Sequence, residues 1–253
     1  MDILTREMIV RAGQCDRFGR FSPDNMLILF QEIAGEHSER LGCGRGAVLK
    51  SGAVWVLTRT ELEILRYPLY IEKITVSTFP TKVRRGIFPR FFYIDDENGE
   101  RLINASSFWT VMDIKTLSMT RLEWLENVMP KNAEREKPMG FPSSAEIVDA
   151  DERLITYSPK YSDLDLNGHV NNTKCAMWLS DLLGEDRLRN NPINSLVVNY
   201  NREIRGLEDI TFSFRVSDSK VSLRCIRDGL SHIDVSAGFF TADKPNIHPL
   251  AAK

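Results

Sequence analysis

The feature that most constrains the fold is a change of hydrophobic period that occurs twice along the chain. In each half, one segment has apolar residues at helical spacing, and the segments after it alternate apolar and polar residues. The helical spacing predicts helices over about Pro23–Leu41 and Asn172–Arg187. The alternation predicts strands over Ala53–Leu65, Ile71–Phe79, Ile87–Asp95 and Ile103–Asp113, and again over Ser195–Ile204, Asp209–Val216, Lys220–Arg227 and His232–Thr241.

The expected helix limits rest on residues that favour caps. Ser22 and Pro23 are typical of an N-cap followed by the first helical residue, and Gly42 predicts the end of the first helix. Asn171 or Asn172 is expected to cap the second helix. In the first predicted strand, strict alternation places these residues on one face: Val54, Val56, Thr58, Thr60, Leu62 and Ile64.

The two halves also share sequence. Asp16-Arg-Phe-Gly-Arg-Phe precedes the first helix, and Asp165-Leu-Asn-Gly-His-Val precedes the second. A single helix-and-sheet unit would leave a strand edge unpaired, whereas two copies joined edge to edge would form one sheet. We therefore expect an α+β pseudo-dimer with a first domain over 1–128, a charged linker with prolines over 129–152, and a second domain over 153–253.

Composition places the chain among ordinary globular proteins. Apolar residues make up 42% and charged residues 27%, and the net charge of −2 does not favour nucleic acid or an anionic membrane as a partner. No apolar run approaches the roughly 20 residues of a membrane helix. The first residues resemble neither a signal peptide nor a transit peptide, so we expect a cytoplasmic protein without membrane insertion.

The sequence contains no recognisable cofactor motif. The four cysteines, Cys15, Cys43, Cys175 and Cys225, lie far apart and lack a C-x-x-C pair or a histidine at ligand spacing, which argues against disulfides and zinc. The chain has no glycine-rich phosphate loop and no G-x-S-x-G elbow. We expect neither a metal nor a cofactor.

Residues able to do chemistry concentrate just before the second helix. A loop that enters a helix offers unpaired N–H groups and the positive end of the helix dipole, which suit an oxyanion. His169, one of only four histidines, can move protons near neutral pH. Such residues also make turns and caps, but the whole cluster favours a catalytic loop. Its members are Asp163, Asp165, Asn167, His169, Asn171 and Asn172.

Other candidates are less specific. Glu203 follows a Leu-Val-Val run, and on its own it is a solvated carboxylate at a strand end. Cys175 and Cys225 fall in a predicted helix and strand, where buried thiols are usually inert. His37 is expected to be a core or capping histidine, with a pocket-lining role left open. A basic group is either a solvated hairpin or a surface for an acidic carrier protein: Lys82, Arg84, Arg85 and Arg90.

The segment Asp163-Leu-Asp-Leu-Asn-Gly-His-Val-Asn-Asn172 resembles the D-L-D-x-N-x-H-V-N-N signature of acyl-ACP thioesterases, enzymes that end fatty acid synthesis in plants and some bacteria. Trp55-Val-Leu-Thr-Arg59 and Ala105-Ser-Ser-Phe-Trp-Thr-Val-Met-Asp113 resemble the N-terminal domain of that family. The resemblance extends through nearly the whole chain. It implies two tandem hotdog domains, in each of which an antiparallel sheet wraps around a central helix.

The resemblance also implies catalytic roles. Asp165, Asn167 and His169 match the catalytic loop of the family, and Tyr200-Asn-Arg-Glu-Ile-Arg-Gly206 matches its Y-R-R-E-C-G motif, which adds Glu203. Plant members often have Cys where this chain has Ile204, so we expect hydrolysis by activated water rather than a cysteine nucleophile at that position.

In the expected mechanism, Glu203, alone or with His169, activates the water, and which of the two is the base stays open. Asn167 and N–H groups at the start of the helix would hold the carbonyl oxygen, and Asp165 would orient its neighbours.

The first half has Gly19-Arg20 where the second has Gly168-His169, so it is expected to lack the site. The resemblance implies that this half holds the acyl chain, in a pocket for which we expect Met26, Phe30 and Trp55. The expected substrate and partner is an acyl carrier protein bearing a fatty acyl chain. Association into a homodimer is left open.

Two other classes of function compete with this one. An acyl-CoA thioesterase or a hotdog dehydratase would use similar residues, although the motif spacing matches hydrolases. A non-catalytic acyl-binding or regulatory module would have no need for Asn167, His169 and Glu203 together.

Overall fold

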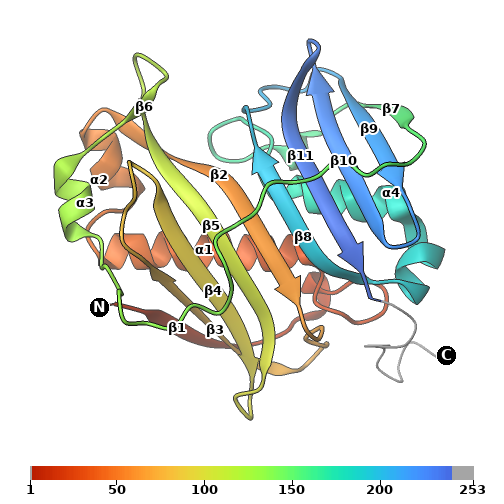
Figure 1. Cartoon of the computed structure of the whole chain (residues 1–253), viewed down its shortest axis with the longest axis horizontal. Helices are drawn as coiled ribbons and strands as arrows, with labels where there is room; N and C mark the ends of the chain where they lie inside the picture. Colours follow the sequence, from red (N-terminus) through yellow and green to blue (C-terminus); the bar gives the residue numbers. More distant parts are fainter. Residues whose placement is uncertain (1, 241–253) are drawn as a thin grey trace. The chain divides into compact units, whose positions relative to one another are not determined.

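The computed structural model describes residues 2–240 (Figure 1). Contacts within the chain divide it into two compact units, Met1–Phe21 with Met26–Pro142 and Ser22–Asn25 with Ser143–Lys253. The predicted domain limits and the edge-to-edge pairing of the two halves stay predictions. Among the described residues, no helix is long and apolar enough to cross a membrane.

The first unit is an antiparallel sheet with one long helix, as the repeated pattern predicts. The strand order is β1-β3-β4-β5-β2, and the short strand β6 pairs with β5. The strands are β1 Leu4–Ile9, β2 Ala53–Ile64, β3 Lys73–Pro80, β4 Phe88–Asp96, β5 Arg101–Asp113 and β6 Met119–Thr120. The helices are α1 Pro23–Arg40, which belongs to this unit from Met26 on, α2 Arg45–Lys50 and α3 Glu123–Val128.

Helix α1 starts at Pro23, as predicted, and ends in a Schellman motif. Gly42 has a φ of 76°, a left-handed conformation that glycine adopts without steric penalty. The N–H of Cys43 donates to the carbonyl of Ser38 at 2.9 Å, which satisfies an open carbonyl of the last turn. The predicted apolar stripe is buried, and Phe30 lies against Phe92 of β4 with ring centroids 4.8 Å apart.

Strand β2 contains a β-bulge at Thr58. Its register against β5 shifts between Leu57 and Arg59, and the Thr58 hydroxyl donates to the carbonyl of Phe108 at 3.1 Å. An extra residue reverses which side chains point inward, so the single face predicted from strict alternation was wrong. The buried residues of β2 are Ala53, Leu57, Thr60, Leu62 and Ile64.

The second unit repeats this plan. The strand order is β8-β11-β10-β9-β7. The strands are β7 Arg153–Tyr157, β8 Ile193–Tyr200, β9 Ile210–Val216, β10 Lys220–Arg227 and β11 Leu230–Phe239, and the long helix is α4 Lys174–Asn190. Thr241, the last residue of the predicted strand His232–Thr241, lies outside the described residues.

The core of the second unit contains an aromatic cluster between α4 and the sheet. The ring of Trp178 lies 5.2 Å from that of Phe212 in β9 and 5.0 Å from that of Tyr157 in β7. Near its end, α4 is interrupted at Gly184, whose φ of 75° and ψ of 172° lie outside the helical region. The helix predicted over Asn172–Arg187 is therefore real but starts later and contains a break.

The edge strands β1 and β7 were missed by the sequence analysis. Each begins its half of the chain and pairs at one edge, with β3 and β9 respectively. Both are short, and few of their residues are buried, so neither shows a strong hydrophobic alternation. Strand β3 begins at Lys73 rather than Ile71, because Ile71 has a φ of 72° and cannot continue a strand.

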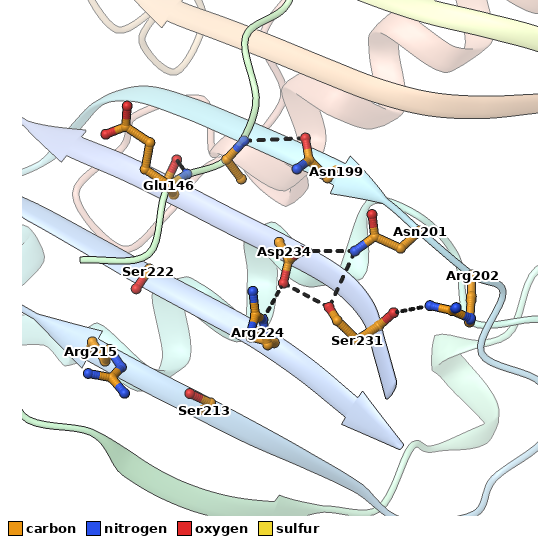
Figure 2. A network of polar contacts seen from close by, with 12 residues as sticks. Glu146, Asn199, Asn201, Arg202, Ser213, Arg215, Ser222, Arg224, Ser231 and Asp234 are labelled. Carbon is orange, nitrogen blue, oxygen red and sulfur yellow. Dashed lines mark hydrogen bonds and ion pairs between the residues drawn. The ribbon is translucent and has the colours of Figure 1, made fainter. Parts of the chain in front are cut away.

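The start of the second unit, at residues 145–148, is anchored to the sheet of that unit through its own backbone. Figure 2 shows part of this contact, with Glu146 lying near strand β8 and Ser222 on the sheet. Three backbone N–H groups donate to side chains of the sheet: Ala145 to Asn199 at 3.3 Å, Glu146 to Ser236 at 3.2 Å and Val148 to Ser222 at 3.0 Å. The segment predicted as a linker is thus ordered where it crosses this sheet.

Candidate active site

Residues 165–169 form a closed loop before α4. The N–H of Asp165 donates to the carbonyl of His169 at 2.7 Å, and the N–H of Gly168 donates to the carbonyl of Asp165 at 3.0 Å. Gly168 has a φ of 76°, where a side chain would add strain. The glycine of the motif therefore allows the tight reversal that brings the two ends of the loop together.

The carboxylate of Asp165 holds the backbone of this loop and the side chain of Asn167. Its Oδ1 accepts the N–H of Asn167 at 2.8 Å and that of His169 at 3.1 Å, and its Oδ2 accepts the amide Nδ2 of Asn167 at 3.2 Å. The sequence analysis expected Asp165 to orient its neighbours, and that catalytic role stays a prediction. Asp165 therefore determines where Asn167 and His169 lie relative to each other.

A second carboxylate, Asp163, anchors the loop to the fold. It is 1% exposed and accepts the hydroxyl of Tyr157 and the N–H of Lys160, both at 2.8 Å. The ammonium of Lys174 lies 3.5 Å from its other oxygen, and its carbonyl accepts the N–H of Asn171 at 2.8 Å. Asp163 thus ties the motif to β7 and to the first residue of α4.

Glu203 lies beside this loop but not on a strand. Strand β8 ends at Tyr200, so the predicted strand Ser195–Ile204 was too long. The N–H of Val170 donates to the carbonyl of Ile204 at 2.8 Å, which holds the Glu203 segment against the loop. His169 Nδ1 and Glu203 Oε1 lie 3.6 Å apart, and the two side chains are 24% and 36% exposed. An imidazole and a carboxylate therefore face each other at a solvent-accessible site.

Two further residues hold Glu203. Arg205 donates to Glu203 Oε2 through Nη2 at 2.8 Å and Nε at 3.2 Å, so Oε1 is the oxygen that faces His169. His232 Nδ1 lies 3.0 Å from the carbonyl oxygen of Glu203. Because a carbonyl only accepts, Nδ1 of His232 carries the proton. Sequence reasoning missed both contacts, since nothing in the local pattern brings His232 near Glu203.

The start of α4 differs from the prediction. The helix begins at Lys174, and Asn171 Oδ1 accepts the N–H of Thr173 at 3.0 Å in a turn before the helix. The prediction that Asn171 or Asn172 caps the helix was therefore wrong. The side chain of Asn171 instead accepts a backbone N–H two residues ahead, a bond that asparagine makes readily in turns. The N–H groups of Asn171, Thr173 and Lys174 already donate within this segment, to Asp163 and Asn171.

The cysteines of this unit are unsuited to act as nucleophiles. Cys175 and Cys225 are fully buried, and burial raises the pKa of Cys175 to about 12 and that of Cys225 well above its ordinary value. The reactive thiolate is therefore strongly disfavoured at both positions. All four cysteines are free thiols, and the described residues contain no group of three or more His, Cys, Asp or Glu that could hold a metal ion.

Of the residues expected to line an acyl pocket, Met26 and Phe30 are buried in the core of the first unit and Trp55 is partly buried. Met26 is fully buried, Phe30 lies on Phe92, and the indole N–H of Trp55 donates to the carbonyl of Cys43 at 3.0 Å. Their contact with an acyl chain stays a prediction. Two clefts in the structure are lined by other residues: one of about 800 Å³ near 132–138 and one of about 460 Å³ near 143–149.

His37 is a core residue, as expected. Its partner is Arg90, which the sequence analysis had placed in a basic group with Lys82, Arg84 and Arg85. Arg90 is 5% exposed, and its Nη1 lies 3.0 Å from His37 Nδ1 and 3.2 Å from the Thr78 hydroxyl. Burial lowers the pKa of Arg90 to about 10. Arg90 therefore does not belong to a solvated basic group, whereas Lys82, Arg84 and Arg85 are exposed.

The chain matches two domain models of one protein family. The acyl-ACP thioesterase N-terminal domain matches residues 2–124, and the acyl-ACP thioesterase C-terminal domain matches residues 148–231. The chain is 28% identical over 212 residues to the acyl-[acyl-carrier-protein] hydrolase FATB3, chloroplastic, of Cuphea viscosissima, which covers 75% of this chain and 50% of that protein. It is 28% identical over 231 residues to the palmitoyl-acyl carrier protein thioesterase, chloroplastic, of Gossypium hirsutum, covering 86% and 56%. The chain thus spans about half the length of the curated relatives it matches.

Solved structures show the same fold. An acyl-ACP thioesterase from Bacteroides thetaiotaomicron matches with a TM-score of 0.86 at 22% identity, over 94% of this chain and 98% of that chain. The 12:0-ACP thioesterase from Umbellularia californica matches with a TM-score of 0.78 at 19% identity, over 94% and 97%. The predicted α+β fold of two hotdog domains is confirmed. Because the two domain models together match most of the sequence, the chain belongs to the acyl-ACP thioesterase family.

Proposed function

We propose that this chain hydrolyses the thioester of fatty acyl-ACP to a free fatty acid and ACP, and so terminates fatty acid synthesis. The observation that carries the proposal is the pairing of the His169 imidazole with the Glu203 carboxylate beside a loop locked by Asp165. In this proposal, the second domain over 153–253 carries the chemistry. The first domain over 1–128 holds the acyl chain, and 129–152 links them.

Water is the nucleophile in this mechanism. The buried thiols of Cys175 and Cys225 do not form thiolates readily, and Ile204 stands where plant relatives often have cysteine. The water oxygen bonds to the thioester carbonyl carbon, and a base takes one of its protons. The C–S bond then breaks, and the proton passes to the leaving sulfur of the carrier protein.

We assign the base to His169 rather than to Glu203. Nδ1 of His169 faces Glu203 Oε1, so Nε2 is the nitrogen that takes the proton from water. A carboxylate beside an imidazole stabilises the imidazolium formed in that step. Arg205 engages the other oxygen of Glu203 and so keeps Oε1 turned toward the ring.

We assign to the amide of Asn167 the role of stabilising the negative charge that develops on the thioester carbonyl oxygen. Asn167 Nδ2 donates to Asp165 Oδ2 at 3.2 Å, which holds the amide in place on the loop beside His169. Backbone N–H groups of Asn171, Thr173 and Lys174 donate within the loop, so they are poorer candidates for this role than expected. A well-placed donor of this kind contributes about a hundredfold or more to turnover.

The test is thiol release from a panel of acyl-ACPs by the native protein, His169→Ala and Glu203→Ala. We expect both variants to lose about a hundredfold or more in turnover while unfolding at the native temperature. Glu208→Ala is the matched control, since Glu208 is an exposed carboxylate near Glu203 that pairs with Arg227.

The same acyl groups on CoA form a second arm that separates a carrier-protein thioesterase from a CoA thioesterase. If the native protein binds acyl-ACP and releases no thiol, the proposal fails and an acyl-binding module takes its place.

A further inference from the structure

A buried carboxylate on the sheet, that of Asp234, lies at the centre of the polar network drawn in Figure 2. Asp234 of β11 is 8% exposed and accepts Arg224 Nε at 2.7 Å, the Ser231 hydroxyl at 2.8 Å and Asn201 Nδ2 at 2.9 Å. Burial raises the pKa of Asp234, but the hydrogen bonds from these three residues outweigh burial and hold the pKa below its ordinary value. The carboxylate therefore stays ionised and ties together two strands and the end of a third.

The network holds the segment of residues 201–203, which contains Glu203. The N–H groups of Asn201 and Arg202 both donate to the carbonyl of His232, at 2.8 and 3.1 Å. Arg202 Nη1 donates to the carbonyl of Ser231 at 3.1 Å, and His232 Nδ1 donates to the carbonyl of Glu203. Each residue from 201 to 203 is thus bonded to the start of β11, which Asp234 holds in turn.

The first unit has the same backbone arrangement with different side chains. The N–H groups of Leu65 and Arg66 both donate to the carbonyl of Leu102, at 2.9 and 3.2 Å. Leu65 therefore corresponds to Asn201, and Leu102 corresponds to His232. Neither leucine has a polar side-chain atom, so the bonds made by the amide and the imidazole belong to the second unit.

From this difference we infer that His232 and Asp234 are positioning residues that hold the Glu203 carboxylate in register with His169. The inference rests on the proposed thioester hydrolysis at this site. Catalytic groups must be placed to within about 0.5 Å, and a shift of about 1 Å can lower turnover about a hundredfold. Loosening the segment is expected to lower kcat and leave KM nearly unchanged, because neither residue lies among those assigned to touch the substrate.

The first test replaces His232 by the residue of the first unit. We expect His232→Leu to lower kcat by about tenfold or more with KM within about twofold of native. His232→Asn is expected to restore most of the rate, because an amide N–H can replace the Nδ1–H donor. Asn201→Leu, at an exposed position, tests the same network if His232→Leu folds poorly. Asn199→Ala is the matched control, since Asn199 bonds the 143–150 segment instead of Glu203.

The second test asks whether His232 acts through Glu203. In a Glu203→Ala background, adding His232→Leu is expected to lower turnover no further, because the group that His232 positions is already gone. If Glu203→Ala keeps native turnover, both the proposed function of Glu203 and this inference fail. If Glu203→Ala is inactive but His232→Leu and Asn201→Leu are native-like, or if the two losses multiply, only the positioning inference is overturned.

Discussion

The loops at 16–20 and 165–169 have the same backbone conformation and hydrogen bonds, but their side chains differ in chemistry. In the first, the N–H of Asp16 donates to the carbonyl of Arg20 at 2.8 Å, and Gly19 donates back to the carbonyl of Asp16 at 3.0 Å. Gly19 has a φ of 75°, against 76° at Gly168. Oδ1 of Asp16 accepts the N–H groups of Phe18 and Arg20, as Oδ1 of Asp165 does for the matching residues.

The side chains of the two loops are used differently. Arg20 turns back onto its own loop, with Nε and Nη2 both 2.7 Å from Oδ2 of Asp16, and its side chain is 6% exposed. Its guanidinium also lies 5.3 Å from the ring centroid of Tyr67. His169 instead faces Glu203 and remains open to solvent. The charged groups of the first loop form an internal ion pair, whereas His169 of the second loop faces Glu203 at a solvent-accessible site.

Tyr67 occupies the place of Glu203 in the first unit. The N–H of Phe21 donates to the carbonyl of Pro68 at 2.8 Å, just as the N–H of Val170 donates to that of Ile204. The residue before each acceptor is Tyr67 in one unit and Glu203 in the other. The comparison teaches that a repeat can keep the backbone scaffold of a loop while its side chains differ, with Arg20 and Tyr67 in one unit and His169 and Glu203 in the other.

The largest effect is expected from His169→Arg, which gives the second loop the residue of the first. Arginine at 169 can pair with Asp165 as Arg20 pairs with Asp16, so the loop should stay folded while proton transfer is lost. We expect thiol release to fall about a thousandfold, with the thermal midpoint within a few degrees of native. Retained turnover would show that this side chain is not what separates the two loops.

Replacing the two aspartates should have opposite consequences. Asp165→Ala removes the acceptor that orients Asn167 and His169, and we expect about a hundredfold loss of kcat. Asp16→Ala leaves the buried Arg20 without its carboxylate, and we expect a loss of about 2–3 kcal/mol in the free energy of unfolding by urea. Similar losses of rate in both variants would contradict the division between a structural and a catalytic loop.

The helices after the two loops should differ at alkaline pH. Counting on from the loops, Cys175 falls where the first helix has Met26, and both are fully buried. The pKa of Cys175 is raised by burial from 9.0 to about 12, so between these values the folded state keeps a proton that the unfolded state loses. Stability therefore falls as pH rises through this range.

Cys175→Ala should remove this part of the decline. We expect the native protein to lose about 2 kcal/mol more than the variant between pH of about 8 and about 10.5, measured by urea unfolding at each pH. Equal slopes in the two proteins would show that Cys175 does not titrate in this way.

The smallest effects are expected at the two loop glycines. A methyl group at Gly19 or Gly168 would meet no atom within 4 Å, so the penalty of Gly→Ala comes from the positive φ alone. We expect each variant to lose about 1 kcal/mol of stability, and only Gly168→Ala to lose several-fold in turnover as well. Stability losses that differ by more than about 1 kcal/mol would show that the two loops are not equivalent.

Local pattern was sufficient for most of the fold and for part of the site. The two long helices, the main strands and the family signature through His169 follow from periodicity, caps and motif letters. The bulge at Thr58 did not, because one inserted residue changes the burial of every later side chain without changing the alternation. Arg90 was also misplaced, since Lys82, Arg84 and Arg85 are exposed whereas contacts with His37 of α1 and Thr78 of β3 accompany the burial of Arg90.

The sequence by itself determined the repeat of helix and strands, the membership of a family, and the identity of the residues in the 165–169 loop, because these depend on spacing along the chain. Only the tertiary structure decided which residues meet across that spacing. The contact of His169 with Glu203, the hold of Arg205 and His232 on that carboxylate, and the burial of Asp234 all join segments far apart in sequence. Such contacts depend on strand register and on where β8 ends, which local sequence pattern does not specify.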